Sequence, residues 1–208
     1  MKHLKWTTIK KDIISAYDAD VQKRLKAKKQ KWKREERKLF FNYLCKEKKQ
    51  SLLEIGAGTG QDSEYFIKKG LKVIAIDISP QHVQHCKKRG CKARVLDMYD
   101  LHTLKKKYDA VYALSSLVHV PKSDFERILR KIKGVLKPGG LFYLGMYGGV
   151  NVEGIYRQDH CRPKRFFSFY YTSDLLAIMQ KHFFLEYFKR IVPFKDGGTY
   201  QSMILRKH

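Results

Sequence analysis

Short apolar runs alternate with helical patterns along most of this 208-residue chain. Leu52–Ile55, Lys72–Ile76 and Tyr108–Leu114 are mainly apolar, as is typical of strands that are buried on both faces. From Phe125 to Leu136, apolar positions recur every three or four residues, which predicts a helix with one buried face. Strands that alternate with helices favour a parallel sheet with right-handed crossovers, so the predicted fold class is α/β.

Further strands are predicted in the middle of the chain and at its end. Ala93–Leu96 and Leu141–Leu144 are short apolar runs that follow helical patterns. Phe183–Val192 and Thr199–Leu205 also read as strands, and a pair of glycines at 197–198 stands between them. Because a short glycine turn can join only antiparallel strands, we expect a hairpin at this end of the sheet.

A turn with three glycines at every second position follows the first predicted strand. Gly56, Gly58 and Gly60 indicate unusual backbone dihedrals and close approach of a ligand. Nucleotide-binding α/β folds place their ligand at such a junction, beyond the carboxyl end of the first strand. A dinucleotide fingerprint would need its third glycine one residue later, where Gln61 stands. Glu54 would repel a pyrophosphate but suits a cationic ligand.

Acidic residues also end the next two predicted strands. Asp77 follows Lys72–Ile76 about 20 residues after the glycine turn, where a carboxylate can accept hydrogen bonds from a ribose diol. Dehydrogenases bind ribose in the same way, and Asp77 could instead serve only the entry of the following helix. Asp97 and Met98 come after Ala93–Leu96. Three acidic residues at three successive strand ends favour one shared ligand.

Glu54–Gly60 resembles the first motif of class I S-adenosylmethionine-dependent methyltransferases, and the helix, Lys137–Gly140 turn and strand resemble a late motif of that family. The resemblance covers roughly residues 50 to 146. It implies a doubly wound three-layer sandwich around a mostly parallel seven-stranded sheet with an antiparallel last strand. Arg165–Tyr171 and His119 resemble an uncharacterised bacterial subgroup of the small-molecule type.

The resemblance implies a cofactor site for S-adenosyl-L-methionine. Glu54 is expected near the amino group of the ligand, Asp77 at the ribose, and Asp97 at the adenine amino group. The full set of expected cofactor-binding residues is Glu54, Gly56, Ala57, Gly58, Gly60, Asp77, Ile78, Asp97, Met98 and Ser115.

The same resemblance divides a single globular unit into an N-terminal helical lid, residues 1–50, and a cofactor-binding domain, residues 51–208. Tyr17 of the lid is expected to help close the site. Residues expected to contact the methyl acceptor are Tyr17, Tyr147, Glu153, Arg165 and Phe166. His119 is the candidate catalytic base, and a structural role at the start of the next helix is its alternative.

The chain is strongly basic, with a net charge of +24 and an isoelectric point near 9.9. Such a charge suggests a polyanionic partner, and Lys23–Lys38 is predicted to form one basic helix. Lysine pairs are nevertheless spread along the whole chain, as on many solvated surfaces. Ser115–Val118 lacks the Asp/Asn-Pro-Pro-Tyr/Phe loop of adenine-type amino methyltransferases, and no cysteine follows a proline as in C5-pyrimidine enzymes. Nucleic acid is therefore the less favoured partner.

The cysteines are scattered and predict neither a disulfide framework nor a metal site; they are Cys45, Cys86, Cys91 and Cys161. No apolar run approaches the roughly 20 residues needed to span a membrane, and the N-terminus lacks the apolar segment of a secretory signal. We therefore expect a cytoplasmic protein with no membrane insertion.

Three functions follow. The leading one is an S-adenosylmethionine-dependent methyltransferase that acts on an oxygen or nitrogen atom of a small molecule. The first alternative is a methyltransferase that modifies RNA or tRNA through the basic surface. The second alternative is a module that binds S-adenosylmethionine without catalysis.

Overall fold

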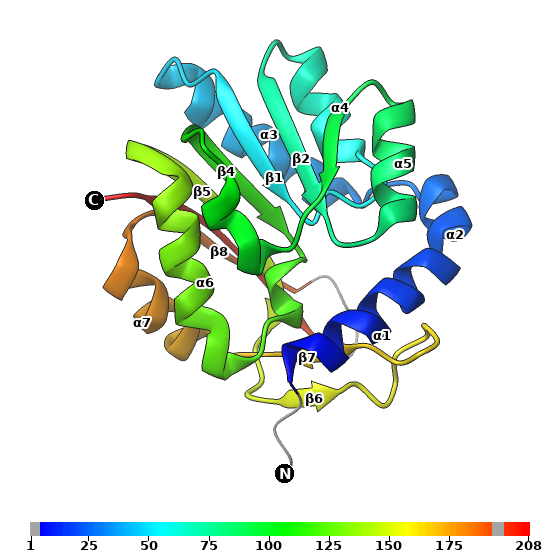
Figure 1. The fold of residues 1–208 in the computed structure, drawn as a ribbon. Coiled ribbons are helices and arrows are strands. Elements are labelled where there is room, and N and C mark those ends of the chain that lie inside the picture. The colour runs from blue at the N-terminus through cyan, green and yellow to red at the C-terminus, as the bar shows by residue number, and fades with distance from the viewer. Residues whose placement is uncertain (1–4, 193–197) are drawn as a thin grey trace.

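The computed structural model describes residues 5–192 and 198–208. Its centre is a seven-stranded sheet with the order β3-β2-β1-β4-β5-β9-β8, covered by helices on both faces (Figure 1). The strands are β1 (Ser51–Ile55), β2 (Lys72–Asp77), β3 (Lys92–Val95), β4 (Tyr108–Leu114), β5 (Leu136–Gly148), β8 (Phe184–Ile191) and β9 (Thr199–Arg206).

Pairing in this sheet confirms the predicted topology. Strands β1 to β5 pair in parallel, whereas β9 is antiparallel to both β5 and β8. The order reverses next to β1, because β2 and β4 lie on its two sides. Such a switch point opens a crevice at the carboxyl ends of the strands, where ligands bind in open α/β sheets.

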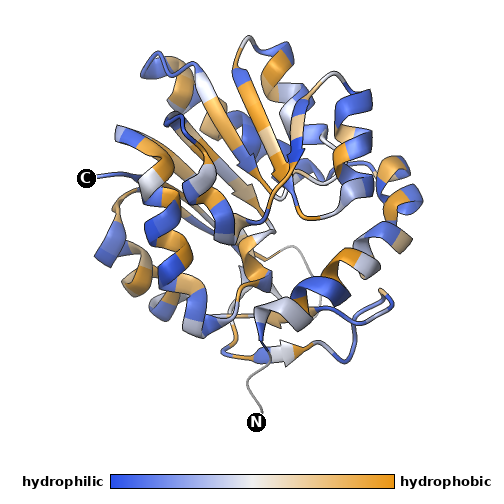
Figure 2. Cartoon of the chain, viewed as in Figure 1, coloured by the Kyte–Doolittle hydropathy of each residue, from blue (hydrophilic) through white to orange (hydrophobic). Residues whose placement is uncertain are grey.

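Each face of the sheet is buried against its own helices. The helices are α1 (Trp6–Ala19), α2 (Val21–Lys26), α3 (Lys31–Lys46), α4 (Gln61–Lys68), α5 (Pro80–Lys88), α6 (Lys122–Val135) and α7 (Thr172–His182). Alternation along β1 sends Leu52 into the core with α3 and α4, and Leu53 into the core with α6 and α7. Figure 2 shows mainly hydrophobic central strands and helices that carry both hydrophobic and hydrophilic residues.

The remaining elements follow β3, β4 and β5. Short 3₁₀ helices η1 (Met98–Thr103) and η2 (Leu117–His119) come after β3 and β4. Strands β6 (Glu153–Ile155) and β7 (Phe166–Ser168) form a separate two-stranded antiparallel sheet beyond β5. It lies beside α1 at the carboxyl edge of the main sheet (Figure 1).

The prediction of one basic helix over Lys23–Lys38 was wrong. The helix is interrupted between α2 and α3, where Ala27 is extended. Gln61 donates its side-chain amide to the carbonyl oxygens of Arg24 and Ala27 at 3.4 and 3.2 Å, and Lys29 pairs with Asp62 at 2.6 Å. These contacts with the start of α4 hold the segment out of helical geometry.

Two other boundaries differ from the prediction. The predicted turn at Lys137–Gly140 is present as an irregularity inside β5: pairing with β4 passes from Leu136 to Leu141, and Gly139 has a φ of +64°. The hairpin of β8 and β9 is confirmed by its antiparallel register, but residue 197 of its expected glycine turn lies outside the described residues. Within 5–192 and 198–208, no helix has the length and apolar character to cross a membrane.

Candidate functional site

A cavity of about 140 Å³ lies at the carboxyl ends of β1, β2 and β4, under α1 and α2. Eight of the predicted site residues line it: Tyr17, Gly56, Gly58, Asp77, Ile78, Met98, Ser115 and His119. Its volume is below the roughly 300–1,000 Å³ of typical ligand pockets, because side chains from α1 and α2 roof it. Lining residues that the sequence did not single out include Trp6, Ile13, Arg24, His82, Leu96 and Ser116.

The glycine turn has the backbone geometry that its sequence predicted. Gly56, Gly58 and Gly60 have φ values of +72°, +55° and +85°. A Cβ atom on Gly56 would lie 2.4 Å from Ser116 Cβ, whereas a Cβ atom on Gly58 would meet no atom within 4 Å. Gly60 begins α4 and approaches Cys86, whose Sγ would lie 2.7 Å from an added Cβ. The turn therefore packs tightly at its ends and is open towards the cavity at Gly58.

Asp77 connects this turn to the start of α5. Its Oδ2 accepts a hydrogen bond from the Gly58 amide at 2.8 Å, and its Oδ1 accepts one from the Ser79 amide at 2.9 Å. Ser79 also caps α5, since its hydroxyl accepts the His82 amide at 3.0 Å. Both interpretations of Asp77 therefore have a structural basis: the carboxylate lines the cavity and also serves the helix entry.

Glu54 is buried behind the turn and does not line the cavity itself. It accepts a short hydrogen bond from the Ser63 hydroxyl. Burial, together with the nearby Asp62 carboxylate, raises the pKa of Glu54 well above its usual range. Asp62 is held by Lys29 at 2.6 Å and Arg37 at 2.8 Å. A cation that reached Glu54 would stabilise its ionised form.

Asp97 is held by the N-terminal helix. Its Oδ2 accepts a hydrogen bond from Trp6 Nε1 at 2.8 Å and pairs with Lys10 Nζ at 2.9 Å. The Trp6 ring stacks on Tyr99 with centroids 4.6 Å apart. Met98 lines the cavity beside Trp6, so α1 covers the predicted adenine end of the site.

His119 forms a chain of hydrogen bonds with Tyr17. Its Nδ1 lies 2.7 Å from the Phe166 carbonyl oxygen, which can only accept, so Nδ1 carries the proton. Its Nε2 lies 2.7 Å from the Tyr17 hydroxyl and therefore accepts from it. Burial lowers the pKa of His119 to about 4, and burial raises that of Tyr17, so both side chains are neutral near pH 7.

Arg165 is committed to an ion pair. Its Nε and Nη2 donate to the two carboxylate oxygens of Asp159 at 2.9 and 2.7 Å. The guanidinium also lies over the Tyr17 ring, 5.0 Å from its centroid, and Arg24 lies 4.4 Å from the same centroid. Arg165 thus contacts Tyr17 but is absent from the lining of the central cavity.

Glu153 is separated from the other predicted acceptor residues. It accepts the backbone amide of Lys122 at 2.6 Å and the Ser168 hydroxyl at 3.2 Å, so it caps the start of α6. It lines a different cavity, formed by β6 and β7. We expected Glu153 in the acceptor pocket because it is close in sequence to the other residues predicted there. Its side chain instead points from β6 to the start of α6.

Tyr147 belongs to an aromatic cluster that the sequence did not indicate. Lys33 of α3 donates to its hydroxyl at 2.9 Å and also lies near the rings of Trp32 and Tyr200. The Tyr200 hydroxyl is 3.1 Å from Ser115 Oγ, which lines the central cavity. Burial, reinforced by the charge of Lys29, lowers the pKa of Lys33 to about 8.

Apart from Arg24, whose buried Nε lies 3.1 Å from Asp20 Oδ2, two polar side chains at the cavity are buried without hydrogen-bond partners in the described part of the chain. Ser116 Oγ and both ring nitrogens of His82 form no hydrogen bond there. Both residues line the cavity. Buried polar atoms without partners are rare in proteins, and a bound polar ligand is one way to satisfy them. These side chains therefore fit a ligand with hydrogen-bonding groups.

A protein-family model described as a methyltransferase domain matches residues 52–140. This range contains the glycine turn, Asp77, Asp97 and His119, and its strands have the order and direction described above. Residues 52–140 are therefore similar to a methyltransferase domain.

Relatives of this methyltransferase domain match just under half of the chain. The ubiquinone biosynthesis O-methyltransferase of Xanthomonas oryzae pv. oryzae (strain PXO99A) is 32% identical over 100 residues, which cover 45% of this chain and 41% of that protein. The S-adenosyl-L-methionine-dependent Diels-Alderase iccD of Talaromyces variabilis is 31% identical over 103 residues, which cover 45% of this chain and 35% of that protein. The matched part of the chain thus covers less than half the length of each of these relatives.

The whole fold also has solved counterparts. The 1,6-didemethyltoxoflavin-N1-methyltransferase of Burkholderia thailandensis, crystallised with 1,6-didemethyltoxoflavin and S-adenosylhomocysteine, superposes with a TM-score of 0.75 and 20% identity. The match covers 97% of this chain and 88% of that chain, so it extends beyond the methyltransferase domain to the N-terminal helices and the C-terminal strands.

Proposed function

We propose that this protein is a methyltransferase that binds S-adenosyl-L-methionine in the central cavity and methylates a small molecule. The observation that carries the proposal is the glycine turn at the cavity wall, where Gly58 leaves open space and its amide is fixed by Asp77. The matched methyltransferase domain and the named relatives support it. A cytoplasmic location remains our prediction.

Six of the ten expected cofactor residues line this cavity, and Glu54 is buried behind the glycine turn. Glu54 would face the ammonium group, Asp77 the ribose diol, and Asp97 with Met98 the adenine. Trp6 and Lys10 cover Asp97, and the cavity is small. We therefore propose that residues 1–50 act as a lid and that α1 moves outward when the ligand enters.

Bound S-adenosylmethionine would supply an electrophilic methyl group on a sulfonium. The protein then has to align the acceptor and receive its proton. Tyr17 can take a proton from an acceptor hydroxyl while it passes its own to Nε2 of His119, which becomes imidazolium. With a pKa near 4, His119 is too weak a base to remove the proton of a hydroxyl before methyl transfer. After methyl transfer the oxygen is still protonated and is a far stronger acid than an imidazolium, so its proton can then pass to His119. The geometry thus favours an oxygen acceptor over an amine.

Arg165 and Phe166 support this pair. The Arg165 guanidinium lies over the Tyr17 ring, and the Phe166 carbonyl fixes the tautomer of His119. We propose that both residues position Tyr17 and His119, and that Tyr147 with Lys33 forms the opposite wall of the acceptor site. The position of Glu153 on the other cavity gives it no part in this proposal.

Two measurements test the function. Calorimetric titration should show binding of S-adenosylmethionine or S-adenosylhomocysteine, weakened by about 1–3 kcal/mol in Asp77→Ala, because a charge-assisted hydrogen bond is lost. Methyl-labelled cofactor, incubated with cell extract, should transfer label to the small-metabolite fraction. Binding of NADH in place of S-adenosylmethionine would contradict the proposal.

The extract experiment also separates the alternatives. Label in RNA, with salt-dependent RNA binding, would favour the RNA-modifying function that the charge of +24 suggests. Cofactor binding without release of S-adenosylhomocysteine from any fraction would favour a non-transferring module. That outcome has a precedent in the name of the Talaromyces relative, a Diels-Alderase that depends on the same ligand.

A further inference from the structure

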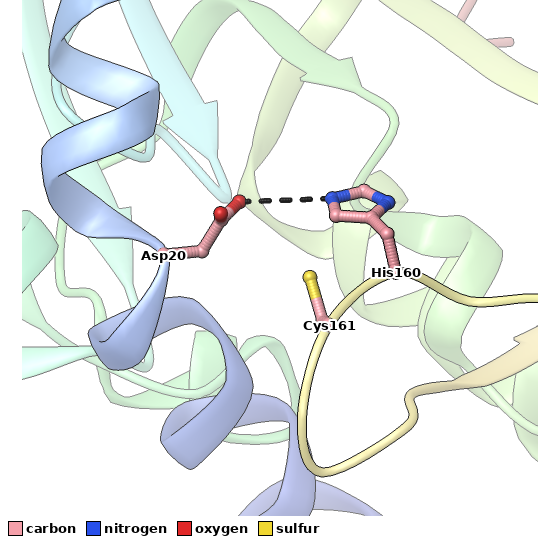
Figure 3. A group of neighbouring side chains, drawn as sticks. All are labelled: Asp20, His160 and Cys161. Atoms are coloured by element: carbon pink, nitrogen blue, oxygen red, sulfur yellow. Dashed lines mark ion pairs between the residues drawn. The ribbon is translucent and has the colours of Figure 1, made fainter.

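Three side chains that are far apart in the sequence converge where the N-terminal helices meet the segment between β6 and β7. Asp20 stands between α1 and α2, and His160 and Cys161 are adjacent in that segment (Figure 3). One potential ligand atom from each residue lies within 4.8 Å of the others. None of the three lines the central cavity, so this cluster is distinct from the cofactor site.

The donor set is a thiol, an imidazole and a carboxylate. Zn²⁺ binds all three groups, at about 2.3 Å for sulfur and about 2.0–2.2 Å for nitrogen and oxygen, in tetrahedral geometry. Donors at these lengths lie between about 3 and 4 Å apart, so small side-chain rotations would bring the three atoms into range. Mg²⁺ and Ca²⁺ prefer oxygen ligands alone and do not match this set.

The His160 ring lies between two carboxylates, which orient it for a metal. His160 Nδ1 lies 3.7 Å from Asp159 Oδ1, whereas its Nε2 faces Asp20 at 3.9 Å. Metal-binding histidines commonly have a carboxylate at the other ring nitrogen, which fixes the ring orientation. Asp159 is itself fixed by its ion pair with Arg165 at 2.7 Å. The His160 ring therefore already presents Nε2 to the Asp20 carboxylate.

The thiol of Cys161 is buried and has no hydrogen bond within the part of the chain that the structure describes, and it points into the space between Asp20 and His160 (Figure 3). Arg24 Nε lies 3.1 Å from Asp20 Oδ2, so this carboxylate oxygen is shared with a cation of the protein. The other oxygen, Oδ1, has no ion-pair or hydrogen-bond partner among the described residues. A rotation of the carboxylate would offer Oδ1 to a metal, because His160 Nε2 faces Oδ2, the oxygen that is paired with Arg24.

We propose that Asp20, His160 and Cys161 bind one Zn²⁺ ion, which joins the N-terminal helices to the segment between β6 and β7. The thiol loses its proton to solvent on binding. His160 is 57% exposed, which leaves room for a water molecule as the fourth ligand. The ion would hold the junction of α1 and α2 close to Tyr17, and its binding does not depend on the methyl acceptor or on S-adenosylmethionine.

Titration of the metal-free, reduced full chain with Co²⁺ tests the site, because cobalt replaces zinc and a thiolate ligand gives a charge-transfer band in the near ultraviolet. We expect one equivalent of Co²⁺, the thiolate band, and displacement of cobalt by Zn²⁺. Cys161→Ser should lose the band, and His160→Ala should weaken binding at least tenfold. The matched controls are Cys45→Ser, an exposed cysteine on α3, and His102→Ala, an exposed histidine on η1; both should bind as the wild type does.

Thermal unfolding gives a second measurement. Zn²⁺ at about ten times the wild-type Kd should raise the Tm of the wild type and of Cys45→Ser, and raise that of His160→Ala much less, because a ligand that binds only the folded state stabilises it in proportion to its occupancy. His160 is exposed, so its substitution should leave folding intact even if Cys161→Ser does not fold. The absence of a thiolate band in the wild type, or equal Co²⁺ affinity in the wild type and His160→Ala, would overturn the site.

Discussion

The two ends of the central cavity are built in different ways. Nine of the ten predicted cofactor residues come from one stretch, residues 54–98, and this end depends largely on backbone: three glycines with positive φ and an amide of Gly58 held by Asp77. The predicted acceptor end joins side chains from separate segments, such as Tyr17 of α1 and His119 of η2. A backbone site of this kind is encoded locally, whereas the acceptor end exists only after α1 has packed on the sheet.

The largest effect should come from the backbone end, through Gly56→Ala. The added Cβ would lie 2.4 Å from Ser116 Cβ at a φ of +72°. The left-handed conformation costs about 1–2 kcal/mol and overpacking about 1–3 kcal/mol more, so we expect a loss of about 2–5 kcal/mol in the free energy of unfolding, measured by urea denaturation.

Gly58→Ala is the matched control for this change. Its φ is also positive, at +55°, but its Cβ would meet no atom within 4 Å. It should therefore lose only the conformational cost of about 1–2 kcal/mol. Equal losses for the two variants would show that the contact with Ser116 does not set the requirement at Gly56.

At the acceptor end, His119→Ala should lower kcat by about 100-fold, the lower range for the loss of a general base. Affinity for S-adenosylmethionine should stay within about threefold, because His119 contacts Tyr17 rather than the glycine turn. Tyr17→Phe should have a similar effect, and the double variant little more, because the two residues act as a unit. Stopped assays of initial rates and calorimetry give the two quantities.

The pH profile adds a check on the same pair. Burial lowers the pKa of His119 to about 4, so His119 should stay neutral, and able to accept from Tyr17, down to about pH 5. The wild-type rate should fall only as the pH approaches 4. His102→Ala is the control, since His102 is exposed and does not line the cavity. Loss of cofactor binding or of folding in His119→Ala would assign His119 a structural role.

Lys33→Met tests the cluster beside Ser115 through the pH dependence of stability. The pKa of Lys33 is lowered from 10.5 to about 8 by burial and by Lys29. Between these pH values the unfolded chain holds more protons than the folded one, so the free energy of unfolding of the wild type should rise with pH relative to the variant. The gain should be about 1–3 kcal/mol from pH 8 to 10.5.

Lys31→Met is the matched control on the same helix, because the Lys31 side chain is 84% exposed. Its stability curve should run parallel to that of the wild type across this range. A Lys33→Met curve that is also parallel to the wild type would mean that Lys33 has an ordinary pKa and is not desolvated by the aromatic cluster.

The smallest expected effect is the release of a proton from Glu54 when the cofactor binds. Burial and Asp62 raise the pKa of Glu54, and a bound ammonium would favour its ionised form, so binding should release a proton. Calorimetry in buffers of different ionisation enthalpy, below about pH 7 where the ligand amine is charged, should detect up to one proton for the wild type. Glu54→Gln should release none, and Glu64→Gln, on α4, should behave as the wild type does. Equal proton release by Glu54→Gln would place the ammonium elsewhere.

The sequence by itself determined the α/β class, the glycine turn and the acidic residues at three strand ends. These features depend on local properties: apolar runs of strand length, and a backbone conformation that only glycine adopts without strain. The mostly parallel direction of the strands and the antiparallel last strand followed from connection rules and from resemblance to a family. The break between α2 and α3 could not be predicted from these rules, since it is held by contacts with Gln61 and Asp62, which lie in another part of the chain.

Only the tertiary structure decided which side chains share the rest of the site. Three pairs of side chains meet because α1 and α2 pack over the carboxyl edge of the sheet and α3 packs on one of its faces: Tyr17 and His119, Lys33 and Tyr147, and Asp20 and Cys161. Glu153 shows the converse: it is close in sequence to the acceptor segment, yet it caps α6. Contacts between distant segments depend on how amphipathic faces pack, and that information is spread over many residues rather than carried by a motif.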